Sequence, residues 1–350
     1  MKEDHRSHKA RQVLEGMRQR LTRQMVLTLT SCTHCGLCSD SCHYVLTNPG
    51  DPTYTPAHKA DQIRKFFNRH VDWTGRVLPW WVRAQTLRND EDLEQLKDTL
   101  FGKCTNCRRC TINCPMGVDF ATVNRMVRGL LVSVGIMPEG VAVVSKDQWE
   151  MGNQMGVLPE EYLETLDWMD EEVRDELGIE HRLIAMDKMD ADFMYTVNPR
   201  EIKYDPRTIA DATKIFTLAG ENWTMASEGW DMTNFGLFSG DDALGGTVAG
   251  RVYEKAKELR ARRVVISECG HGYRSTRCEG SNWNGVEAGV QMESAIVTMI
   301  RYAYVDLDKT YVLWVCCILL GTGVLAAVGY YEKRRDRIRA AVREFRRWEH

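Results

Sequence analysis

Hydrophobic positions near the start of the chain recur at the spacing of a helix. The apolar residues follow one another at intervals of three or four, with arginines between them: Leu14, Met17, Leu21 and Met25. Such intervals place side chains on one helical face. Residues 1–24 are therefore predicted to form a basic amphipathic helix. The pattern leaves open whether this helix lies on an anionic membrane, docks on a partner or packs on its own domain.

Helical patterns continue through the next two regions of the chain. The clearest stretches are Pro56–Asn68, Asp90–Leu100 and Glu160–Leu177. Residues 25–125 contain no run in which apolar and polar residues alternate as they do in a half-buried strand. We expect a helical domain over residues 25–125 and a helical, acidic connector over residues 126–205.

The pattern changes near residue 206. Helical stretches at Pro206–Ala219 and Asp241–Arg260 come before Arg263–Ser267, a short apolar run typical of a buried strand. Helices that alternate with buried strands indicate an α/β arrangement. Residues 206–308 are therefore predicted to form an α/β half-domain.

One long apolar run lies near the end of the chain. Tyr311–Tyr331 is 21 residues long and contains no charged side chain. As a helix it would span about 30 Å, the thickness of a bilayer's hydrocarbon core. We predict a transmembrane helix over residues 309–331, with a buried core helix as the alternative. Residues 332–350 carry eight Lys or Arg against four acids and are predicted to form a basic amphipathic tail.

Charge and cysteine content exclude two classes of protein. A net charge of −3 over 350 residues gives no basis for nucleic-acid binding. A secreted disulfide scaffold would be short and would follow an apolar signal segment, which the first residues do not provide. We therefore expect the body to fold in a reducing compartment, where its thiols are available for metal.

Eight of the twelve cysteines form two runs with identical spacing. Each run reads C-x2-C-x2-C-x3-C, the spacing of two-cluster bacterial ferredoxins, in which the fourth cysteine binds the other cluster. Structural zinc is the alternative, but zinc ribbons usually pair two C-x2-C knuckles without a third central cysteine. The pattern predicts two electron-conducting [4Fe–4S] clusters. Their expected ligands are Cys32, Cys35, Cys38 and Cys114 for one, and Cys104, Cys107, Cys110 and Cys42 for the other.

A further cysteine follows the predicted strand at Arg263–Ser267. Cys269 and His271 lie just past its carboxyl end, where open α/β sheets usually build their sites. The residues alone leave three roles open for Cys269. It can be a reactive thiolate, a metal ligand or a buried structural cysteine.

Together with the cysteine runs, three stretches carry a resemblance to a known family. Gly220–Thr224, Trp230–Asp241 and Val265–Arg274 resemble heterodisulfide reductase HdrD-like (DsrK-like) iron–sulfur subunits of membrane redox complexes associated with sulfite reduction. The resemblance implies an α+β multidomain protein whose α/β half-domain is of the cysteine-rich (CCG-like) type. It also implies anaerobic respiration linked to sulfur metabolism, a quinone-reactive b-type cytochrome as membrane partner, and a ligand or catalytic role for Cys269.

The chain departs from this family after Asp308. Family members continue with a CC-G-type run that supplies most ligands of a third, catalytic [4Fe–4S] centre. Here Cys316 and Cys317 lie within the apolar run and are followed by Ile-Leu-Leu. A third centre, and with it disulfide chemistry, stays doubtful.

Three functions are compatible with these features. We predict an electron-transfer subunit of a membrane-associated respiratory oxidoreductase, with its body on the cytoplasmic side of the inner membrane. The alternatives are a disulfide or trisulfide reductase whose third cluster is completed by a partner, and a membrane-tethered assembly protein with non-redox clusters.

Overall fold

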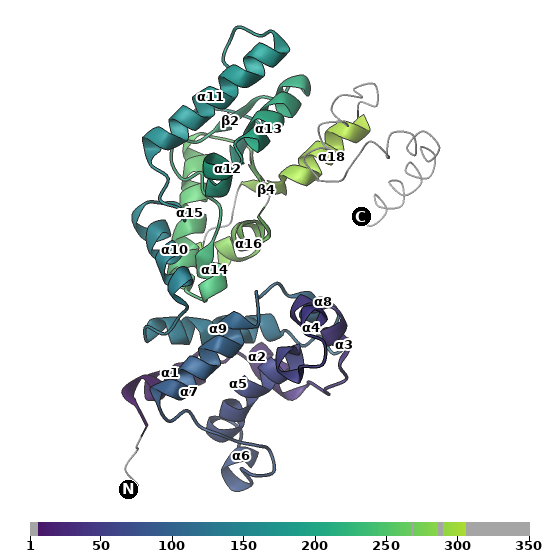
Figure 1. Cartoon of the computed structure of the whole chain (residues 1–350), viewed down its shortest axis with the longest axis vertical. Helices are drawn as coiled ribbons and strands as arrows, with labels where there is room; N and C mark the ends of the chain where they lie inside the picture. Colours follow the sequence, from purple (N-terminus) through teal and green to yellow (C-terminus); the bar gives the residue numbers. More distant parts are fainter. Residues whose placement is uncertain (1–5, 268, 286–289, 306–350) are drawn as a thin grey trace, which may run out of the picture. The chain divides into compact units, whose positions relative to one another are not determined.

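The structure is a computed structural model that describes residues 6–267, 269–285 and 290–305. These residues form two compact units, each assembled from separate segments of the chain (Figure 1). The first unit comprises residues 6–157, 231–255 and 269–285, and the second comprises residues 158–230, 256–267 and 290–305.

The first unit is helical. Its longer helices are α1 (His8–Arg20), α2 (Arg23–Thr30), α5 (Pro56–His70), α7 (Asp90–Lys97), α9 (Phe120–Ser133), α10 (Glu139–Glu150) and most of α15 (Asp242–Glu258). Short helices connect them: α3 (Leu37–Asp40), α4 (His43–Thr47), η1 (Pro52–Tyr54), α6 (Thr74–Val77), η2 (Asp98–Gly102), α8 (Arg109–Ile112), α14 (Phe235–Ser239), α16 (Gly270–Arg274), η3 (Ser275–Glu279) and α17 (Gly280–Asn284).

Helix α9 is central to the core of this unit. It is apolar over most of its length, and α1, α2, α5 and α7 all pack against it. The apolar face of α1, including Val13, Leu14 and Met17, is buried in that core. Of the three roles left open for the N-terminal helix, packing within its own unit is the one that the structure supports.

The second unit is built on a four-stranded parallel sheet in the order β2-β1-β3-β4. Its strands are β1 (Phe193–Thr196), β2 (Trp223–Met225), β3 (Arg263–Ile266) and β4 (Gln291–Ser294), and its helices are α11 (Pro159–Leu177), α12 (Pro199–Tyr204), α13 (Arg207–Leu218) and α18 (Ala295–Val305). In register, Phe193 pairs with Trp223 on one side and with Arg263 on the other. Parallel strands need crossover connections, which explains why helices separate them in sequence.

Several predicted elements are confirmed. Helices α5, α7, α11, α13 and α15 fall where the periodicity placed them, and β3 begins at Arg263 as predicted. Strand β1 was missed, because it lies inside residues 126–205, which were interpreted as a helical connector. All four of its residues are buried, so the strand shows no alternation of apolar and polar positions by which it could be recognised.

The predicted fold class needs one correction. It included a C-terminal transmembrane helix, yet no helix in the part of the chain that the structure describes is long and apolar enough to cross a bilayer. The prediction depended on hydropathy alone, over residues 309–331, and those residues lie outside the described ranges. For the described residues the fold class is α+β.

Asp170 connects α11 to the segment that leads toward β1. Its buried carboxylate accepts hydrogen bonds from the backbone N–H groups of Leu183 (2.8 Å) and Ile184 (2.7 Å). Asp170→Ala would leave these amides without an acceptor. Each amide that stays buried then lowers the free energy of unfolding by about 1–3 kcal/mol. We expect a loss of roughly 2–4 kcal/mol in denaturant unfolding, whereas Asp175→Ala, at an exposed position of the same helix, changes stability by less than about 0.5 kcal/mol.

Asp231 makes the stability of the first unit depend on pH. Burial raises the pKa of its carboxyl to about 6, although Thr233 and Gln154 donate hydrogen bonds to it. Because the unfolded-state pKa is near 3.9, the unfolded chain loses this proton first as the pH rises. Stability should therefore fall between about pH 4 and pH 6. Denaturation midpoints measured across this range should show that fall in the wild type and a smaller one in Asp231→Asn.

Candidate functional site

Both cysteine runs fold into loops with the same backbone shape. In the first loop His34 and Gly36 have positive φ (56° and 86°), and in the second Asn106 and Arg108 do (59° and 64°). A short helix follows each loop, α3 in one and α8 in the other. Residues in the left-handed region let successive backbone N–H groups point into one concave surface, which favours a bound anion. The two runs therefore form matching cradles.

The cradles line two neighbouring cavities in the first unit. The first cavity is lined by five cysteines, namely Cys32, Cys35, Cys38, Cys110 and Cys114. The second is lined by Cys42, Cys104, Cys107 and Cys110. Each run thus sends its fourth cysteine to the cavity of the other run, and Cys110 borders both. Pro56 and Phe120 also contribute to both cavities and give them apolar walls.

Crowding of these thiols has an electrostatic consequence. Burial raises the pKa of Cys110 to about 12, and the neighbouring Cys104 and Cys107 contribute to the rise. Burial likewise raises the pKa of Cys38, with Cys32 as the next cause. Thiolates so placed repel one another and need a cation to stay ionised. Iron ions would supply that charge, so the donor set fits an iron–sulfur cluster.

Two amide groups donate hydrogen bonds to a sulfur of the second run. The backbone N–H of Asn106 donates to Cys104 Sγ at 3.3 Å, and the side-chain amide of Asn124 donates to the same sulfur at 3.5 Å. Within the described residues, Asn106 Nδ2 is buried and has no hydrogen-bond partner. A buried amide N–H without a partner at this position fits a site in which a sulfur of a bound cluster accepts its hydrogen bond.

Two buried cations lie next to ligands of the second set. Arg128 is fully buried on α9 and donates to the carbonyl oxygens of Cys104 and Leu100. Burial lowers its pKa to about 10, so it stays protonated at neutral pH. Lys59, only 1% exposed, places Nζ 3.8 Å from Cys42 Sγ. A positive charge beside a cluster favours its reduced, more negative state.

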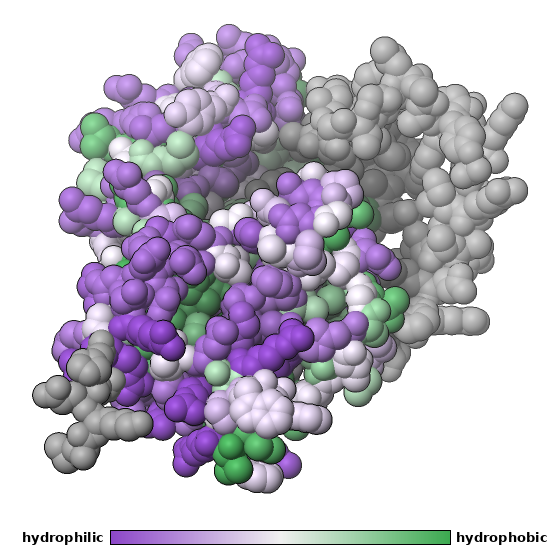
Figure 2. Space-filling model, turned by 60° about the horizontal axis from the view of Figure 1, so that its bottom comes forward, coloured by the Kyte–Doolittle hydropathy of each residue, from purple (hydrophilic) through white to green (hydrophobic). Residues whose placement is uncertain are grey.

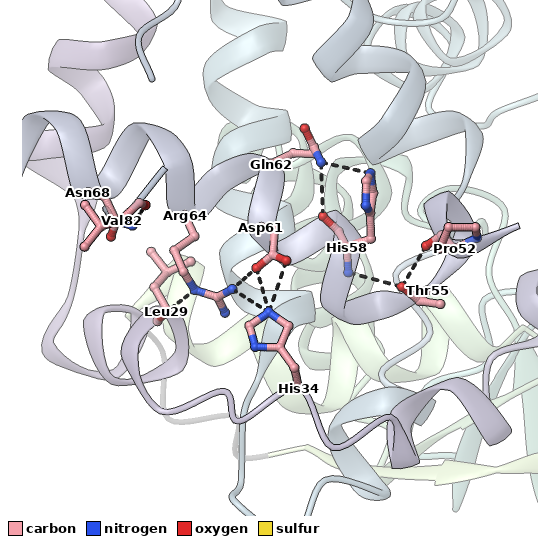
Figure 3. Close-up of polar contacts among 10 residues, drawn as sticks. All are labelled: Leu29, His34, Pro52, Thr55, His58, Asp61, Gln62, Arg64, Asn68 and Val82. Carbon is pink, nitrogen blue, oxygen red and sulfur yellow. Dashed lines mark hydrogen bonds and ion pairs between the residues drawn. The ribbon is translucent and has the colours of Figure 1, made fainter. Parts of the chain in front are cut away.

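The first cysteine loop is tied to α5 by a polar network (Figure 3). Nε2 of His34 lies 3.0 Å from Asp61 Oδ1 and 3.2 Å from Arg64 Nη1. Arg64 also pairs with Asp61 and donates from Nε to the carbonyl oxygen of Leu29 at 2.6 Å. His34 therefore holds the loop in place through its ring nitrogen.

Cys269 is the N-cap of α16, and its Sγ accepts a hydrogen bond from the N–H of Gly272 at 3.3 Å. The same segment contacts the second cysteine loop: Arg274 donates to the carbonyl oxygen of Asn106 at 3.0 Å, and His271 Nε2 lies 3.3 Å from that of Thr105. Among the described residues, no three His, Cys, Asp or Glu side chains are placed to hold a single metal ion. The catalytic role of Cys269 stays a prediction, and Cys316 and Cys317 lie outside the described residues.

The residues that sequence reasoning missed are Lys59, Asn124 and Arg128. A signal for two of them was present in the sequence. Asn124 and Arg128 are four residues apart in a mostly apolar helical stretch, so they share a face that the apolar pattern directs into the core. Polar side chains on such a face need buried partners, which here belong to the second cysteine loop.

Comparisons with known proteins agree with this geometry. The 4Fe-4S dicluster domain model matches residues 28–118, which include both cysteine runs. The chain is 29% identical over 270 residues to Hdr-like menaquinol oxidoreductase iron–sulfur subunit 2 of Archaeoglobus fulgidus, covering 75% of this chain and 48% of that protein. It is 26% identical over 250 residues to the Hdr-like menaquinol oxidoreductase iron–sulfur subunit of Archaeoglobus profundus, covering 69% and 44%.

A third relative matches a shorter stretch. HdrD of the dihydromethanophenazine:CoB–CoM heterodisulfide reductase of Methanosarcina mazei is 29% identical over 120 residues, covering 34% of this chain and 28% of that protein. No solved structure matches. The chain spans about half the length of the Hdr-like relatives. The homologues of this chain are thus Hdr-like menaquinol oxidoreductase iron–sulfur subunits and HdrD, which confirms the resemblance of its sequence to HdrD-like iron–sulfur subunits.

Proposed function

We propose that this chain is the iron–sulfur electron-transfer subunit of a membrane-associated respiratory oxidoreductase complex. It holds two [4Fe–4S] clusters with crossed ligation, one by Cys32, Cys35, Cys38 and Cys114 and the other by Cys42, Cys104, Cys107 and Cys110. The observation that carries this proposal is the pair of cavities, each lined by three cysteines of one run and the fourth of the other.

When bound, each cluster supplies a centre that takes up and releases one electron. The residues of this chain hold the two centres. Cys110 borders both cavities, and Pro56 and Phe120 give each of them an apolar wall. Conduction is accordingly the role that we assign to this site.

The membrane partner and the location of this electron transfer are proposed from the names of the relatives. Two of them are named as subunits of menaquinol oxidoreductases. We therefore propose a quinone-reactive b-type cytochrome as the membrane partner and the membrane surface as the location. Isolation of the native complex from anaerobically prepared membranes tests this, because haem b should co-purify with the chain.

Cysteine variants test the crossed ligation. The wild type should contain eight iron and eight sulfide per chain. Cys42→Ser and Cys107→Ser should perturb the same electron paramagnetic resonance signal of the reduced protein. Cys114→Ser and Cys35→Ser should perturb the other signal. Cys278→Ser, an exposed cysteine outside both runs, serves as the matched control. If Cys42→Ser instead perturbs the signal that Cys35→Ser perturbs, each run binds its own cluster and the crossed assignment is wrong.

Arg128 should raise the reduction potential of the second cluster. We expect Arg128→Gln to lower that potential by roughly 100 mV, the effect of one unit charge at about 8 Å with an effective dielectric constant of about 20. Arg128→Lys, which keeps the charge, should lower it much less. Redox titration followed by paramagnetic resonance measures both clusters, so the first cluster is an internal reference. Equal shifts of both potentials, or equal effects of Gln and Lys, would contradict an electrostatic role.

A further inference from the structure

The insert between the two cysteine runs presents a patch of large apolar side chains to solvent. They lie on α6 and on the segments that flank it, in the first unit (Figure 1). Their exposed fractions range from 44% to 72%, and the residues are Trp73, Val77, Leu78, Trp80 and Trp81. Figure 2 shows hydrophobic and near-neutral residues together at the lower edge of the view, with hydrophilic residues beside them. We call these five residues the tryptophan patch.

The backbone under the tryptophan patch is fixed by specific contacts. Gly75 is buried against α5, where a Cβ would lie 1.8 Å from the carbonyl oxygen of Asn68. Asn68 also donates from Nδ2 to the carbonyl oxygen of Val82 at 2.9 Å, and the N–H of Gln85 donates to the carbonyl oxygen of Lys65 at 3.0 Å. The segment is therefore held in a defined shape while its largest side chains are exposed. Scattered exposed apolar residues need no explanation, but a supported cluster of this size indicates a binding surface.

Positive charge accompanies the patch. Residues 64–89 contain six Lys or Arg and one acid. Four of the arginines are exposed, namely Arg69, Arg76, Arg83 and Arg88. Tryptophan prefers the boundary between headgroups and acyl chains, and arginines beside it attract anionic headgroups. An ordinary protein interface would also use tryptophan, but the excess of one charge sign favours a surface that carries many negative charges.

We infer that the tryptophan patch and the arginines around it bind the surface of a bilayer that contains anionic lipids. The tryptophan rings enter the interfacial region, and the guanidinium groups pair with headgroup phosphates. This inference goes beyond the proposed function, since it assigns lipid contact to the chain itself rather than to a partner subunit. It also does not depend on the clusters, so either proposal can fail alone.

Vesicle binding by the purified full chain tests the inference. We expect co-sedimentation with phosphatidylglycerol-containing vesicles and much weaker binding to pure phosphatidylcholine. Hydrogen exchange followed by mass spectrometry should show slower exchange within residues 73–83 on binding the anionic vesicles. This readout identifies the bound segment even if another part of the chain also binds lipid.

Variants separate the contribution of the tryptophan rings to lipid binding from that of the arginine charges. The double change Trp80→Ser with Trp81→Ser should weaken binding about tenfold or more, because both rings lose apolar burial. Arg76→Gln should weaken binding to anionic vesicles about fivefold and leave binding to neutral vesicles unchanged. Trp168→Ser, on α11 and 59% exposed, is the matched control and should change nothing.

Two results would overturn the inference. One is vesicle binding without any slowing of exchange within residues 73–83. The other is slowing there only when a membrane protein is present in the vesicles, which would make the patch a protein-docking surface.

Discussion

The packing of eight thiols into one small helical unit is the constraint that organises this protein. Buried thiols become harder to ionise as their neighbours approach, and the raised pKa of Cys110 reflects this. A site of this kind is stable only when a strongly cationic group occupies it. Because each run contributes its last cysteine to the other cavity, neither of the proposed clusters can be built without both runs. Cluster binding and the folding of the first unit are therefore coupled.

Buried charge around the site is distributed unequally. Arg128 and Lys59 both approach ligands of the second set, and Asn106 and Asn124 add hydrogen bonds to one of its sulfurs. All of these favour the reduced state of a cluster there. In the proposed relay, electrons would consequently collect on the second cluster. The segment beginning at Cys269 contacts the second cysteine loop through His271 and Arg274.

The spacing of the cysteines was enough to predict a 4Fe-4S dicluster domain, and the helical periodicity was enough to predict α5, α11 and α13, because these signals are local. Other features depend on long-range pairing. Strand β1 is four residues long and is defined by its neighbours β2 and β3 rather than by its own pattern. Each unit is assembled from segments that lie far apart in the sequence, so its make-up also depends on long-range contacts that local patterns do not reveal. Arg128 lies in an apolar stretch, and only the fold reveals the carbonyl groups that accept its hydrogen bonds.

Two clusters held by interlocked cysteine sets, as we propose, must lie close together. The most direct measurement is the paramagnetic resonance spectrum of the chain as reduction proceeds from one electron to two. We expect a simple spectrum at one electron and a broadened, split spectrum at two, since two neighbouring paramagnetic centres interact magnetically. A fully reduced sample whose spectrum is the plain sum of two independent signals, or one that contains zinc and no acid-labile sulfide, would contradict it.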